Sequence, residues 1–192
     1  MRPPVALALA LALGVLGAAP PPGLPHGNDH FRLGMSRAQV DSAVIARELS
    51  VISNGTAFLV CAGDDPMVEY EQYSFFAAPH GMEFLWKMTV GYRLTASPED
   101  LAVVRGQLAR QLGEPTSDTG EAGDAASPTG SRPAATARQV IWADALTTVQ
   151  LGARWTDAPD RNAERMMVTW TDRRLQRLIE ARRKKDKTSA SN

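Results

Sequence analysis

The chain has 192 residues, enough for one domain of common size once its termini are set aside. Its 21 basic and 21 acidic side chains cancel, so the composition excludes an overall electric field that would attract nucleic acid or an acidic membrane surface. The single cysteine, Cys61, excludes an internal disulfide, and its apolar neighbours predict a buried thiol rather than a nucleophile.

Residues 1–19 have the pattern of a secretory signal peptide. Arg2 precedes an apolar run over Val5–Leu16, and small residues follow it as at a cleavage site. The apolar stretch of about 15 residues is shorter than the ~20 that a helix needs to cross a bilayer. We therefore expect a periplasmic or secreted protein, without a lipid anchor because no cysteine follows the signal. An uncleaved N-terminal anchor is the alternative, since Pro20–Pro22 follow the signal directly.

The next segment, residues 20–30, is rich in Pro and Gly and predicts a flexible lead-in to a single folded domain over residues 31–179. The first helix of that domain has clear start signals. Ser36 and Gln39 form a capping box, and Met35 and Val40 flank it at the spacing of a hydrophobic staple.

Three strands are predicted after this helix. Residues 51–62 and 68–77 are rich in β-branched and aromatic side chains, and a turn at Gly63–Pro66 separates them. Residues 83–94 alternate apolar and polar side chains, which is typical of a strand with one buried and one wet face. The aromatic residues of that strand are interpreted as core.

A second helix is predicted over residues 97–112. Ser97 is placed as the N-cap and Pro98 as the first helical residue, while Gly113 suits a left-handed C-cap and Pro115 stops the helix. Residues 116–137 are small and polar, and they predict a mobile loop.

Three further strands are predicted at residues 139–142, 147–154 and 166–171, and Asp172 is expected to cap a short terminal helix. The fold class is thus α+β, in the order α-β-β-β-α-β-β-β. This order predicts either one antiparallel sheet with two helices on one face or a tandem pair of α-βββ units.

Residues 180–192 are predicted to form a basic disordered tail. Functionally, the tail offers an alternative role in contacting anionic lipid or an anionic cell-wall polymer. The residues that would make this contact are Arg182, Arg183, Lys184, Lys185 and Lys187.

Catalytic side chains are scarce. A hydrolase or metal-dependent enzyme would have to use His80 with the acids between Asp64 and Glu71, and a turn histidine beside solvated carboxylates is the preferred interpretation. A metal site formed by His26, Asp29 and His30 is disfavoured because the segment that carries them is expected to be flexible. We therefore predict no catalytic residue, no metal and no cofactor.

Two short motifs resemble those of a known family. The first resembles the Gly-Met-Ser/Thr-x-x-x-Val opening of the small outer-membrane-assembly lipoproteins (SmpA/OmlA, or BamE-like) and their relatives with the β-lactamase-inhibitor-protein fold. The second resembles that family's Leu-Gly-x-Pro turn and later strand tryptophan. The residues that carry the resemblance are Gly34, Met35, Ser36, Gln39 and Val40 in the first motif and Gly113, Pro115 and Trp142 in the second.

The resemblance implies a protein-binding role without catalysis, and the partner it implies is another envelope protein. In physical terms these motif residues are interpreted as mainly structural. Trp142, Asp144 and Thr147 form a further compact cluster, in which Asp144 is expected to bond the backbone of a turn. From the sequence we expect an exported, non-catalytic binding or assembly module.

Overall fold

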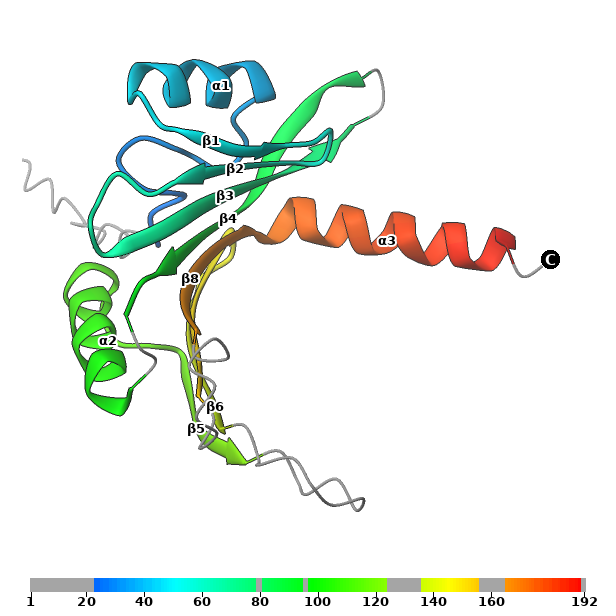
Figure 1. Cartoon of the computed structure of the whole chain (residues 1–192). Coiled ribbons are helices and arrows are strands. Elements are labelled where there is room, and N and C mark those ends of the chain that lie inside the picture. Colours follow the sequence, from blue (N-terminus) through cyan, green and yellow to red (C-terminus); the bar gives the residue numbers. More distant parts are fainter. Residues whose placement is uncertain (1–22, 79–80, 95–96, 124–135, 156–164, 191–192) are drawn as a thin grey trace, which may run out of the picture.

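The computed structural model describes residues 23–78, 81–94, 97–123, 136–155 and 165–190 (Figure 1). This part of the chain forms three helices and eight strands. In chain order they are α1 (Arg37–Ala46), β1 (Val51–Asn54), β2 (Phe58–Ala62), β3 (Val68–Ala77), β4 (Glu83–Tyr92), α2 (Pro98–Leu112), β5 (Ser117–Gly123), β6 (Thr136–Ala143), β7 (Thr147–Trp155), β8 (Arg165–Asp172) and α3 (Arg173–Ala190).

All eight strands belong to one antiparallel sheet with the order β1-β2-β3-β4-β8-β7-β6-β5. A helix followed by four consecutively paired strands makes up each half, and the pairing of β4 with β8 joins the halves at the centre. The α+β class and the single antiparallel sheet are confirmed. The number of strands is larger than the six that the sequence predicts.

The two additional strands have local explanations. Residues 51–62, predicted as one strand, turn back at Gly55, whose N–H donates to the carbonyl of Phe58 at 2.9 Å, and so form the hairpin of β1 and β2. Strand β5 lies in the predicted loop 116–137 and has no apolar periodicity. It forms because its backbone pairs with β6, beginning at Ser117 opposite Ile141, and residues 124–135 lie outside the described residues.

The core of the first half lies between α1 and strands β2 to β4. Helix α1 begins at the predicted capping box, where the Ser36 hydroxyl accepts from the Gln39 N–H and the Gln39 side chain accepts from the Ser36 N–H. Val40 and Val44 face the sheet and are buried. The side chains that they pack with include Leu59, Cys61, Tyr73, Phe75, Leu85 and Met88.

The second half repeats this arrangement with α2. Ser97 caps the helix, and Gly113 ends it with a φ of 82°, a conformation that favours glycine. Leu101, Val104 and Leu108 form the buried stripe. They pack on a sheet surface made of Val140, Trp142, Val149, Leu151, Ala153, Met166 and Val168.

Strand register places α1 and α2 on the same face of the sheet. Met88 belongs to the first core and Val149 to the second, and both are cross-strand partners of Trp170. Directly opposite residues point to the same side of a sheet, so the two cores form one continuous layer. Helix α3 lies against the other face, inside the bend of the sheet in Figure 1.

Helix α3 differs from the sequence prediction. Its N-terminus is capped by Asp172 as expected, but it continues to Ala190, where a disordered tail over residues 180–192 was predicted. Arg, Leu, Lys and Ala follow the cap, and all four residue types favour a helix. The predicted signal peptide lies outside the described residues, and no helix within them has both the length and the apolar character needed to cross a membrane.

Candidate functional site

The N-terminal strap, residues 23–33, joins the two halves of the molecule. Leu24 packs against the second core, and Phe31 is fully buried in the first. The Leu24 N–H donates to Asp144 Oδ2 at 2.7 Å. Residues 23–30 therefore differ from the flexible lead-in that the sequence predicts, because they carry one apolar anchor and specific polar contacts.

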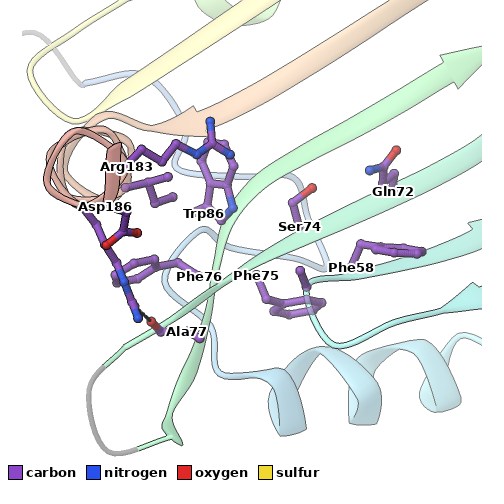
Figure 2. A pocket seen from close by; sticks show the side chains of 12 residues that line it. Phe58, Gln72, Ser74, Phe75, Phe76, Ala77, Trp86, Arg183 and Asp186 are labelled. Carbon is purple, nitrogen blue, oxygen red and sulfur yellow. Dashed lines mark hydrogen bonds between the residues drawn. The ribbon is translucent and has the colours of Figure 1, made fainter. Parts of the chain in front are cut away.

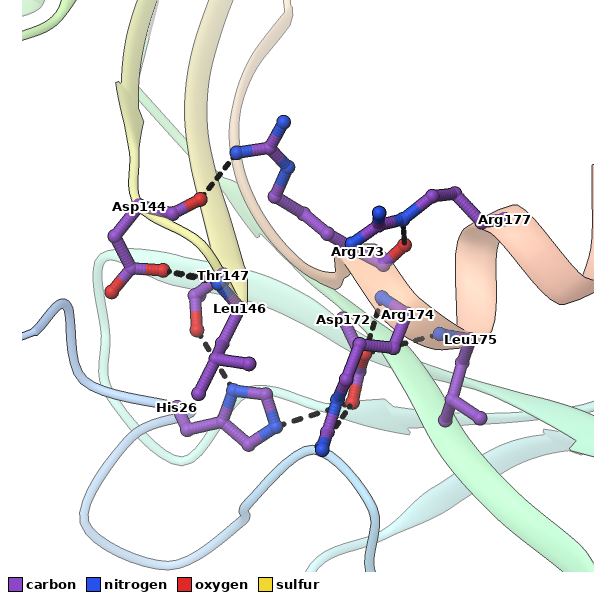
Figure 3. Close-up of polar contacts among 9 residues, drawn as sticks. All are labelled: His26, Asp144, Leu146, Thr147, Asp172, Arg173, Arg174, Leu175 and Arg177. Carbon is purple, nitrogen blue, oxygen red and sulfur yellow. Dashed lines mark hydrogen bonds and ion pairs between the residues drawn. The ribbon is translucent and has the colours of Figure 1, made fainter.

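His26 lies at the centre of those polar contacts (Figure 3). Its Nδ1 lies 2.8 Å from Thr147 Oγ1, and its Nε2 lies 3.2 Å from Asp172 Oδ2. A hydroxyl, an imidazole and a carboxylate in this order resemble the nucleophile, the base and the orienting carboxylate of a catalytic triad. However, Thr147 is 0% exposed, so no substrate can reach its hydroxyl. The set ties the strap to β7 and β8, and we assign it no catalytic role.

Both carboxylates of this cluster are held by backbone donors. Burial of Asp172 opposes its ionisation, but hydrogen bonds from the N–H groups of Leu175 and Arg174 outweigh that effect and lower its pKa. The pKa of Asp144 is likewise lowered despite burial, by N–H groups that include those of Thr147 and Leu146. The Asp144 contacts are the turn bonds that the sequence predicts.

The acids between Asp64 and Glu71 do not gather into a catalytic pair. Glu71 is buried, accepts from the Tyr73 hydroxyl, and faces Arg47 with N–O distances of 3.4 and 3.5 Å. Asp64 is half-exposed and bonds the same guanidinium, which lowers the pKa of its carboxyl. Asp65 accepts from the Met67 N–H within a turn.

Neither enzymatic alternative gains support from these positions. His80 lies outside the described residues, and Glu69 is exposed. Within the described ranges, no three His, Cys, Asp or Glu side chains are grouped so that they could hold a metal ion. Burial raises the pKa of the Cys61 thiol, and Glu71 opposite it adds to that effect, so Cys61 is no activated nucleophile.

The motif residues hold the helices to the sheet. Gly34, with a φ of 89°, donates its N–H to the Leu85 carbonyl at 2.7 Å, and the Met35 carbonyl accepts from the Leu85 N–H at 2.8 Å. In the second half, Trp142 Nε1 donates to the Gly113 carbonyl at 2.8 Å. The two residues of the Leu-Gly-x-Pro and tryptophan motif thus touch across 29 positions of sequence.

The sheet face opposite the two cores is polar, and we call it the open face. Along β7, buried Val149 and Leu151 alternate with half-buried Thr148 and Gln150, and no described helix other than α3 packs against this side. Cross-strand pairing sets its residues in two adjacent rows over β3, β4, β8 and β7. The rows are Gln72, Thr89, Thr169 and Gln150, and Ser74, Lys87, Thr171 and Thr148.

A pocket of about 400 Å³ lies where α3 crosses the end of this face (Figure 2). Aromatic side chains of Phe58, Phe76 and Trp86 line it from the sheet, and Ile179 lines it from α3. Of the basic residues singled out in the sequence, Arg182 and Arg183 line this pocket. Lys184 and Lys185 are exposed on α3 and do not line it. Sequence reasoning missed the pocket because it assigned these residues to a disordered tail.

In comparisons with family models, curated proteins and solved structures, nothing matches this chain. The assignment of function therefore depends on the geometry described above.

Proposed function

We propose that the protein is an exported cell-envelope protein that binds another envelope protein through the open face. The observation that carries this proposal is the pair of polar rows across four strands, on a face that α1 and α2 leave uncovered. The partly exposed hydroxyl and amide groups there offer both donors and acceptors, whereas Thr89 is buried and pairs its Oγ1 with Thr169 Oγ1 at 3.2 Å.

The composition of the open face fits a reversible partner better than an internal packing surface. Binding surfaces of separable proteins are about as polar as the rest of a protein surface, whereas permanent interfaces resemble a divided core. Gln150, Thr169 and Thr171 are half-buried and uncharged, so a partner can cover them without removing a full charge from water. The predicted signal peptide and the motif resemblance favour a partner in the envelope.

We further infer that the chain consists of two related α-ββββ units. The support is the mirrored strand order about β4 and β8 and the equivalent position of α1 and α2 on one face. Each unit has one strand more than the tandem α-βββ pattern expected from the sequence. A pair of related units explains how a small motif builds an open face that spans both halves.

Site-specific photo-crosslinking in intact cells tests the binding proposal. A photoreactive residue at Gln150 or Thr169 should yield a defined crosslinked protein, because both side chains belong to one polar row of the open face and are partly exposed. The matched control carries the same residue at Gln111, which is exposed on α2. Equal yields from all three positions, or no product from Gln150 and Thr169, would rule out the open face as the binding surface.

A charge variant provides a second test. Gln150→Glu with Thr169→Glu places two carboxylates side by side in one polar row of the face, where a bound partner would have to desolvate them. Recovery of the crosslinked partner from a reporter position at Thr148 should fall at least about tenfold, since burying an unpaired charge costs several kcal/mol. Gln111→Glu should leave recovery unchanged. Thermal unfolding of each variant checks whether its fold is kept.

A further inference from the structure

The pocket between α3 and the sheet has a wall of apolar side chains supplied by three different elements, β3, β4 and α3. Phe76 and Trp86 come from neighbouring strands of the open face, and Ile179 reaches them from the first half of α3. Figure 2 shows Phe76 and Trp86 beside the helix, on the sheet side of the pocket. Small-molecule sites have the same character, with apolar linings and a few well-placed polar groups.

The polar groups of this pocket carry a net positive charge. Arg182 and Arg183 are consecutive on α3, and Asp186, one helical turn further on, also lines the pocket. Two cations and one anion leave a net charge of one. Arg182 Nη1 donates to the Ala77 carbonyl at 3.2 Å, which fixes one guanidinium at the rim. Arg183 extends toward Trp86 in Figure 2.

We propose that this pocket binds a single-chain anionic amphiphile of the alkyl carboxylate class. The alkyl chain would lie against Phe76, Trp86 and Ile179, and the carboxylate would pair with Arg182 and Arg183. A guanidinium matches a carboxylate in shape as well as in charge, with two parallel N–H donors. The volume of about 400 Å³ suits one chain, because it lies near the low end of the usual range for ligand sites.

This proposal requires no partner on the open face, although the pocket shares Gln72 and Ser74 with the polar rows of that face. Isothermal titration of the full chain with decanoate, below the concentration at which it forms micelles, tests it directly. We expect one decanoate per chain. Decyltrimethylammonium has a similar alkyl chain and a cationic head, and it should bind at least about tenfold more weakly, since charge-assisted hydrogen bonds are lost.

Paired charge variants separate the pocket from the general charge of the helix. Arg182→Ala with Arg183→Ala should weaken decanoate binding about tenfold or more. Lys184→Ala with Lys185→Ala removes the same charge from neighbouring positions that do not line the pocket, and it should leave binding within about twofold, because neither lysine lies where the carboxylate would bind. Equal losses in both variants would overturn the proposal in favour of diffuse attraction to α3.

The apolar wall needs its own variant. Ile179→Asp places a carboxylate on the helix side of the pocket without altering the sheet, and it should abolish decanoate binding while circular dichroism stays unchanged. Vesicles of phosphatidylglycerol serve as the competing probe. Binding to those vesicles without binding to dissolved decanoate, or decanoate binding that Ile179→Asp leaves intact, would overturn the pocket and favour a membrane surface as the ligand.

Discussion

At the scale of single residues, a buried network fixes the end of α1 to the sheet. Glu71 is 6% exposed, and its carboxylate faces the guanidinium of Arg47, the residue that forms the C-cap of α1. The guanidinium carbon of Arg47 also lies 5.4 Å from the ring centroid of Phe31. The Tyr73 hydroxyl donates to the same carboxylate. A buried carboxylate is tolerated inside a protein only while a counter-ion and hydrogen-bond donors remain beside it.

Removal of the cation should therefore be costly. We expect Arg47→Met to lower the free energy of unfolding by about 3 kcal/mol or more, because it leaves the Glu71 carboxylate buried without its counter-ion. The control is Asp64→Asn, which alters the exposed partner of the same guanidinium and should cost at most about 1 kcal/mol. Urea unfolding followed by circular dichroism measures both. Similar losses would show that Glu71 does not depend on Arg47.

At the scale of elements, local signals predicted where α1 begins and where α2 begins and ends. The capping box at Ser36 and the glycine at Gly113 lie where the sequence places them, because each satisfies backbone groups of its own helix. Strand β5 was missed because its polar residues gain order only from pairing with β6. The contact of His26 with Thr147 joins residues 121 positions apart, and no local pattern encodes such a pairing.

Helix α2 offers a matched pair of glycines. Gly106 lies inside the helix and Gly113 ends it at a φ of 82°, and a methyl group at either position would meet no atom within 4 Å. The space available to a methyl group is thus the same at both positions, and only the backbone conformation differs, helical at Gly106 and left-handed at Gly113. We expect Gly106→Ala to stabilise the protein by about 0.5–1 kcal/mol and Gly113→Ala to destabilise it by about 1–2 kcal/mol.

Thermal unfolding checks this pair, because the two substitutions should shift the melting temperature in opposite directions. Two shifts of the same sign would mean that the cap conformation of Gly113 is not required for the end of the helix.

At the scale of the whole molecule, the strap, the β4–β8 pairing and Trp170, which packs against both cores, connect the two halves. The strap is held by carboxylates: the Leu24 N–H bonds Asp144 and His26 faces Asp172. Both carboxylates have pKa values below the usual aspartate value near 3.9. Their contribution to stability is complete above that value and is lost as the pH falls through the lower pKa of the folded state.

Low pH should therefore weaken the contacts that hold the strap to the sheet. We expect the free energy of unfolding to fall as the pH drops below about 4. Asp144→Asn should make that decline shallower, because an amide does not titrate. Its single oxygen can still accept from Leu146 and Thr147, whereas the Leu24 N–H loses its acceptor, so the variant should also be less stable at neutral pH. Urea midpoints measured between neutral and strongly acidic pH test this. If the stability of the variant fell with pH as steeply as that of the original protein, Asp144 would not contribute to the acid sensitivity.

The burial of Cys61 in the first core has a practical consequence for handling the protein. Its side chain is 0% exposed, and its raised pKa keeps the thiol protonated, so two folded molecules cannot become crosslinked through sulfur. Preparations can thus be stored in air without a reducing agent. Any covalent dimer seen on a non-reducing gel then comes from molecules that have unfolded, so the single thiol reports on the quality of the sample.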